Sequence, residues 1–156
     1  MSKGDRIEAY VHSLGFDGQS YHPCYLAYFA CFNNQEYYEA HDVLEHLWLQ
    51  GAGDNYAFYK GLIQLAGAFV HLKKQRERPH HHKDGRRMHP AVRLFALADK
   101  NLTPYAPVHF GLDIAQTLDL ATRHVAHIVK SDFTDNPWHP ERAPHLSLEN
   151  ISSENI

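Results

Sequence analysis

Two sets of polar side chains follow helical spacing within sequence that is otherwise largely apolar. They are His41, Glu45 and Trp48 in the first set and Lys60, Gln64 and His71 in the second. Positions i, i+4 and i+7 share one face of an α-helix, so each set is expected to point in one direction. Burying such groups costs free energy unless they are paired or coordinated. The two sets are therefore the candidate functional site.

One chemistry that this pattern would support is metal binding. Two imidazoles and one carboxylate can hold a divalent metal such as zinc and leave a position open for water, which then ionises near neutral pH. His41 and Glu45 from one helix and His71 from the next would be the ligands. The spacing differs from the zincin helix, and no general base is evident once Glu45 serves as a ligand. The metal site would thus lack an established mechanistic template.

Four further residues are candidates for contacts with a ligand. Gln64 or Lys60 would orient or polarise a substrate, and Trp48 with Tyr38 would form an apolar wall beside it. These residues would serve equally in a site for an organic ligand or a protein partner. Such a site is a second hypothesis for the same helices.

A third hypothesis is purely structural. Glu45 can accept a hydrogen bond from His41 one turn away, and His71 and Gln64 can satisfy each other or backbone groups across the helix pair. A buried polar network of this kind can fix helix register without any chemistry. The protein would then be a non-enzymatic helical module for binding or assembly.

The periodicity of apolar residues predicts an all-α, single-domain bundle of about six helices. The expected helices span residues 5–14, a stretch that begins near 23, a stretch that ends near 49, and residues 56–75, 90–100 and 112–129. Asn33 and Glu36 resemble a capping box at the start of the third helix, and Pro90 suits the first position of the fifth. No segment alternates between apolar and polar residues in the manner of a hairpin, so no sheet is expected.

Length and composition agree with a single domain. A chain of 156 residues, 44% apolar, can bury a substantial core. The expected organisation is a helical bundle over residues 1–130 and an extended, proline-containing tail over 131–156. A loose tail is the ordinary outcome, and Trp138 offers an anchor on the bundle or on a neighbouring subunit. The charged start and the shortness of the apolar run at 61–72 predict a soluble, cytoplasmic protein.

Positive charge is concentrated in residues 73–93. This stretch has eight Lys and Arg residues against Glu77 and Asp84, and it also contains His80, His81 and His82. Such a segment would bind phosphate or an acidic partner, hold metal loosely, or remain a solvated loop. Sequence-specific nucleic acid and membrane partners are not expected, whereas a homo-oligomer stays open.

The central part of the chain resembles the domain-of-unknown-function 309 family. The likeness rests on the run 37–45, Trp48, the run 61–66 and His71, and it extends more weakly over residues 26–128. The resemblance implies a small all-helical protein, of a kind often labelled a predicted metal-dependent hydrolase from its His and Glu pattern. The characteristic positions that it implies are Glu39, His41, Glu45, Trp48, Gln64 and His71. Residues 75–90 depart from the family pattern, because a longer His-rich loop replaces a short turn.

Overall fold

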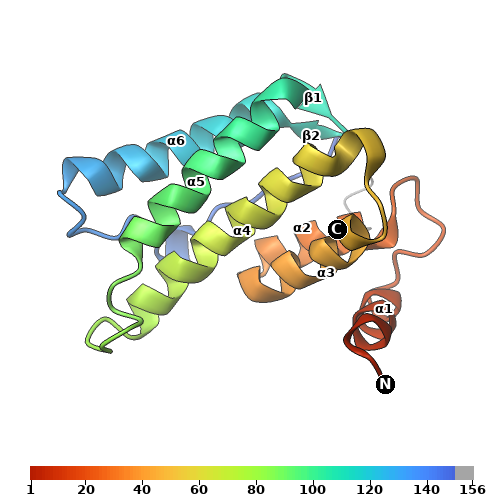
Figure 1. Ribbon diagram of the computed structural model, residues 1–156, viewed down its shortest axis with the longest axis horizontal. Helices are drawn as coiled ribbons and strands as arrows, with labels where there is room; N and C mark the ends of the chain where they lie inside the picture. The colour runs from red at the N-terminus through yellow and green to blue at the C-terminus, as the bar shows by residue number, and fades with distance from the viewer. Residues whose placement is uncertain (150–156) are drawn as a thin grey trace.

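The protein is all-α, as its sequence predicts. The computed structural model describes residues 1–149, and six α-helices account for most of them (Figure 1). The helices are α1 (Lys3–Ser13), α2 (Pro23–Asn33), α3 (Tyr37–Leu49), α4 (Tyr56–Glu77), α5 (Met88–Leu102) and α6 (Ile114–Lys130). Short 3₁₀ turns lie at Gly53–Asn55, Thr103–Tyr105 and Pro140–Arg142. Within residues 1–149, no helix is both long and apolar enough to cross a membrane.

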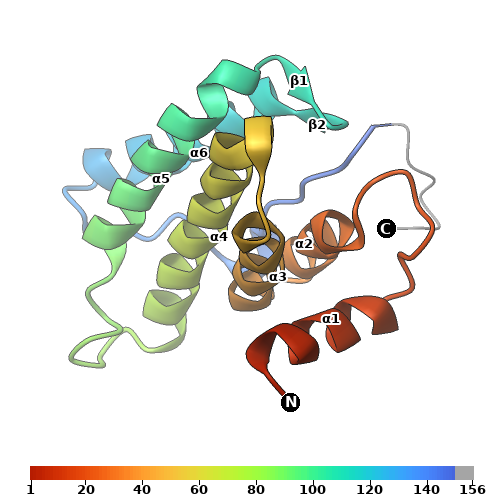
Figure 2. The same cartoon turned by 45° about the vertical axis from the view of Figure 1, so that its right-hand side comes forward.

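The longest helix, α4, is the centre of the fold. It packs against α3 on one side and α5 on the other, with α2 beyond α3 and α6 beyond α5 (Figures 1 and 2). Its apolar residues are buried on several sides, as expected for a helix with neighbours all round. The short α1 lies at the outer edge, beside α2 and α3 (Figure 2). This order places α3, α4 and α5 next to one another.

Two glycines allow α4 and α5 to approach closely. A Cβ atom at Gly61 would lie 2.7 Å from Cγ of Leu102, and one at Gly67 would lie 3.1 Å from Cδ1 of Leu94. Gly67 leaves room for a neighbour because it has no side chain, and that neighbour is α5. The side chains of α4 that flank these glycines are therefore brought near α5 as well as α3.

The segment after α6 runs back across the bundle. Trp138 is only 2% exposed and donates its indole N–H to the Tyr37 hydroxyl at 2.9 Å. Arg76 of α4 donates from Nε and Nη2 to the carbonyl of Trp138, at 3.0 and 2.7 Å. Of the outcomes open from the sequence, Trp138 thus anchors this segment on its own bundle. The end of the expected tail, residues 150–156, lies outside the described residues.

The expectation of no sheet was wrong at one place. Strands β1 (Val108–His109) and β2 (Leu112–Asp113) form a small antiparallel hairpin. Its two central residues, Phe110 and Gly111, have φ angles of 47° and 73°, as a type I′ turn requires. Phenylalanine rarely adopts this conformation. The Asn-Gly or Asp-Gly pair that usually signals such a turn in a sequence is therefore absent. Here the Phe110 ring packs on Tyr25 and on other aromatic rings of the core, which compensates for the backbone conformation.

The predicted starts of α3 and α5 were also wrong in detail. Asn33 is the last residue of α2, and its side chain exchanges two hydrogen bonds with the backbone of Leu146. It therefore does not cap α3, which begins at Tyr37 after Glu36 without a side-chain cap. Helix α5 begins at Met88, two residues before Pro90. Proline is tolerated there because the first-turn N–H groups have no partner within the helix.

Candidate ligand-binding groove

A groove of about 240 Å³ lies where α3, α4 and α5 meet. Its lining comes from all three helices and combines a few polar side chains with an apolar majority. The lining residues are Tyr38 and His41 of α3, Ile63, Gln64, Gly67, Val70 and His71 of α4, and Leu94 of α5. Gly67 contributes no side chain, so the groove can extend down to the α4 backbone.

Four of the residues predicted from sequence line this groove. They are Tyr38, His41, Gln64 and His71. The Tyr38 ring is 59% exposed and lies roughly parallel to the His41 ring, at 6.3 Å between centroids. The polar faces of α3 and α4 therefore meet at these four residues.

The other predicted residues lie elsewhere. Trp48 packs on Tyr56 with ring centroids 5.1 Å apart, and the Lys60 ammonium lies 5.7 Å from the centroid of the same Tyr56 ring. The Trp48 indole nitrogen is buried without a hydrogen-bond partner among the described residues. Glu45 lies beside His41, with 3.6 Å between Oε2 and Nε2, and is not among the residues that line the groove. The predicted ligand set Tyr38, Trp48, Lys60 and Gln64 is thus divided between two places.

The protonation state of His71 follows from its partner. Nη1 of Arg87 lies 3.1 Å from Nδ1 of His71. A guanidinium can only donate, so Nδ1 must accept and the ring proton must be on Nε2. Burial, followed in order of importance by the positive charges of Arg87, Lys74 and Arg93, lowers the pKa of His71 to about 4. At neutral pH His71 is therefore an uncharged donor through Nε2, and that nitrogen has no partner among the described residues.

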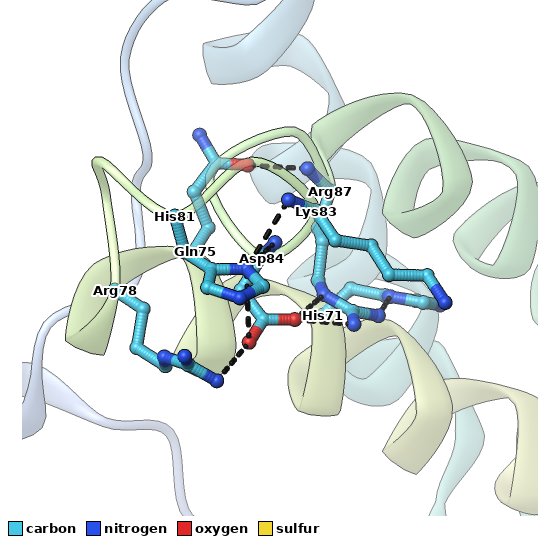
Figure 3. Close-up of polar contacts among 7 residues, drawn as sticks. All are labelled: His71, Gln75, Arg78, His81, Lys83, Asp84 and Arg87. Atoms are coloured by element: carbon cyan, nitrogen blue, oxygen red, sulfur yellow. Dashed lines mark hydrogen bonds and ion pairs between the residues drawn. The ribbon is translucent and has the colours of Figure 1, made fainter.

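Arg87 is held in place by contacts at the basic loop, residues 78–87, which connects α4 and α5. Its Nε donates to Oδ1 of Asp84 at 2.9 Å, and its backbone N–H donates to the Gln75 side chain at 2.7 Å (Figure 3). Asp84 is only 7% exposed and also accepts from Nη1 of Arg78 at 2.8 Å. These cations lower the pKa of the Asp84 carboxyl below its ordinary value, chiefly through the hydrogen bond from Arg87. The loop is therefore organised around one buried acid.

Sequence reasoning missed Asp84 and Arg87 as parts of the site. The available signal was an acidic residue within a strongly basic stretch, three positions before an arginine. Charge counting treated Asp84 only as an offset to the positive charge. The contact from Arg87 back to His71, sixteen residues earlier, depends on how α4 and α5 pack, so periodicity along one helix could not indicate it.

Gln64 is paired with α5 and not with His71. Its Oε1 accepts a hydrogen bond from Nδ2 of Asn101 at 2.7 Å. The structural hypothesis had Gln64 and His71 satisfying each other or backbone groups across the helix pair. In the structure Gln64 is paired with the Asn101 side chain and His71 with the Arg87 side chain. The amide N–H groups of Gln64 have no partner among residues 1–149, so they are available to the groove.

The predicted metal ligands do not come together as a set. Within residues 1–149, no group of three or more His, Cys, Asp or Glu side chains is arranged to hold a metal ion. His41 and Glu45 are adjacent, whereas the Arg87 guanidinium occupies Nδ1 of His71. A cation bound beside that guanidinium would be repelled by it. The residues present do not fit a three-ligand zinc site.

Comparison with known proteins supports the family resemblance over part of the chain. Residues 25–82 match the family model described as Domain of unknown function (DUF309). The matched stretch contains most of α2, all of α3 and α4, and the start of the basic loop. No match was found among curated proteins or among solved structures. The groove is therefore built largely from the matched helices, together with Leu94 of α5.

Proposed function

We propose that the protein is a binding module whose groove between α3, α4 and α5 takes a small uncharged molecule with an apolar body and a carbonyl oxygen. One observation carries the proposal: His71 is a neutral donor whose Nε2 has no partner among residues 1–149, and it lines a largely apolar groove. A donor on a partly buried side chain that has no protein partner favours a ligand that supplies an acceptor.

The apolar body is inferred from the lining. Ile63, Val70 and Leu94 provide aliphatic surface, and the exposed Tyr38 ring flanks it. Pockets for small molecules are usually apolar with a few polar groups that fix orientation. A volume of about 240 Å³ suits one ring or a short branched chain.

The uncharged carbonyl is inferred from the polar groups. His71 offers Nε2–H, and Gln64 offers amide N–H groups, since Asn101 already occupies its oxygen. Both groups donate and neither carries a charge at neutral pH. The nearby charges of Arg87 and Lys74 disfavour a cationic ligand.

Benzamide is a suitable probe, with toluene as a matched molecule that lacks the acceptor. Titration followed by NMR is expected to shift resonances of Val70, Gln64 and His71 when benzamide is added. In His71→Phe, which keeps a ring but removes the donor, we expect benzamide affinity to fall about tenfold, as loss of one hydrogen bond in a sheltered site does. Toluene affinity should change little.

His12→Phe is the matched control, because the His12 side chain is 80% exposed and lies on α1, away from the groove. It should leave the affinity for both probes unchanged. Val70→Trp should block both probes by filling the groove. Equal benzamide affinity in wild-type and His71→Phe protein would contradict the proposal, as would binding that survives in Val70→Trp.

Metal-dependent hydrolysis, the activity that the family resemblance implies, has one observation in its favour. His41 and Glu45 lie within 3.6 Å of each other, so two of the proposed ligands are adjacent. The third ligand, His71, has its Nδ1 engaged by Arg87. We therefore rank this function second.

Elemental analysis distinguishes the two functions. The protein should be purified without an affinity tag and with His80, His81 and His82 replaced by serine, because exposed histidines bind metal adventitiously. Under the binding-module proposal, the metal content is expected to be far below one ion per chain and equal in His41→Ala. A stoichiometric metal that is lost in His41→Ala would instead support the metalloenzyme.

A further inference from the structure

A second and larger hollow lies between α6 and the C-terminal segment. Its volume is about 480 Å³, and its walls come from residues 112–124 and 142–147. Unlike the groove, it is lined by charged and polar side chains. Its chemistry therefore calls for a different ligand.

Two arginines provide positive charge to this hollow. Arg142 has no ion pair or side-chain hydrogen bond among the described residues. Nε of Arg123 donates to Asp119 at 2.8 Å, which leaves its two terminal nitrogens without partners in the same part of the chain. Asp113 and Asp119 also line the hollow. Asp119 is the acceptor of Arg123, and Oδ1 of Asp113 accepts the Gln116 N–H at the start of α6. Guanidinium donors without acceptors suit the oxygens of a carboxylate or phosphate.

His124 supplies an acceptor to the same hollow. Its Nδ1 donates to the Leu120 carbonyl at 2.8 Å, so in the neutral ring Nε2 carries a lone pair. Burial lowers the pKa of His124, which keeps the ring neutral at physiological pH. The ring packs against Phe69 at 5.0 Å between centroids and against Phe95 at 5.7 Å. These two rings fix the orientation of the His124 ring. Its Nε2 has no partner among residues 1–149.

The outer wall of the hollow is also held in place. The Asn33 side chain exchanges hydrogen bonds of 2.8 and 2.7 Å with the backbone of Leu146, and Leu148 pairs with Leu112 through an antiparallel bridge. Leu146 and Leu148 are each 6% exposed. The segment that carries Arg142 is therefore fixed on both the α2 and the hairpin side, and the hollow exists before any ligand arrives.

We infer that this hollow binds a small organic anion that also carries a hydroxyl group, with the anion at Arg142 and Arg123 and the hydroxyl donating to Nε2 of His124. Hydroxylated phosphates and carboxylates share this chemistry. The inference does not depend on the groove, since the two places have no lining residue in common.

The probes are glycerol 3-phosphate, inorganic phosphate, lactate and glycerol. Binding is measured by NMR titration, which follows the resonances of the His124 ring and of the Arg123 and Arg142 side chains. Glycerol 3-phosphate or lactate should bind more tightly than phosphate, and glycerol should not bind. If glycerol 3-phosphate binds more tightly than lactate, the ligand is a phosphate; if lactate binds more tightly, it is a carboxylate. Arg142→Gln is expected to weaken binding at least about tenfold, as loss of a charged hydrogen bond does.

Two further variants keep the inference falsifiable. Arg86→Gln removes the same charge from the exposed basic loop, and it should leave affinity unchanged. His124→Phe keeps an aromatic ring against Phe69 and Phe95 but removes Nε2. It should therefore weaken the binding of glycerol 3-phosphate and leave the affinity for inorganic phosphate unchanged. The inference is overturned if no probe shifts these resonances, or if Arg86→Gln and Arg142→Gln weaken binding equally.

Discussion

Replacing Trp138 by alanine is expected to lower the free energy of unfolding by about 3–5 kcal/mol, the usual cost of truncating a large buried aromatic residue. The Trp138 side chain is 2% exposed and meets the Tyr37 ring edge-on, with centroids 6.1 Å apart. Its loss would leave a cavity beside Tyr37 and remove the hydrogen bond to the Tyr37 hydroxyl. Urea unfolding followed by circular dichroism measures the change.

The matched control is Leu49→Ala, because Leu49 is 70% exposed at the end of α3. It should change the free energy of unfolding by no more than about 0.5 kcal/mol. Tyr37→Phe should cost about 1–3 kcal/mol, since it leaves the Trp138 N–H buried without an acceptor. A loss below about 1 kcal/mol in Trp138→Ala would mean that the C-terminal segment contributes little to the fold.

The second large expected effect is the titration of His71. Its pKa, lowered to about 4, means that the ring stays neutral over most of the acid range. NMR titration of the ring carbon protons measures this pKa directly. Because Arg87 is the largest charged cause, Arg87→Met is expected to raise the pKa of His71 towards its ordinary value, while burial continues to hold it below. Arg93→Gln, which removes the smallest of the three charged causes, should raise it less.

The same shift makes folding depend on pH in a definite direction. A histidine whose pKa is lowered by folding binds protons more weakly in the folded state than in the unfolded chain. Its contribution to stability is therefore present above its unfolded value, about 6.5, and is lost as the pH falls from there towards about 4. His22, His109 and His124 also have lowered pKa values, chiefly because of burial, and they add to the same trend.

Comparison of variants isolates the part that belongs to His71. Stability of wild-type protein should fall more steeply between pH 6.5 and 4 than stability of His71→Phe, which lacks the group. The loss of stability of Arg87→Met over this pH range should be intermediate between that of the wild-type protein and that of His71→Phe. If wild-type and His71→Phe protein lose stability in parallel over this range, the neutral state of His71 and its donor assignment are both wrong.

The order of the helices could be read from the sequence with good accuracy. Apolar residues at helical spacing and the glycines and prolines between helices are local signals, and they placed all six helices within a few residues. The apolar residues on several sides of α4 are a further local signal, because a helix of this kind must have neighbours on several sides. The start of α3 was misplaced for a reason that is not local: the Asn33 side chain has two possible uses, and only the position of Leu146 decides between them.

The sequence by itself determined that His41, Gln64 and His71 lie on helix faces with other polar residues, because helical geometry is set by spacing alone. Only the tertiary structure decided what those residues do. The relative placement of α3, α4 and α5 put His71 against Arg87 and left Glu45 and Trp48 outside the groove. A histidine's proton position and charge depend on partners that come from distant parts of the chain, and no periodicity within one helix encodes them.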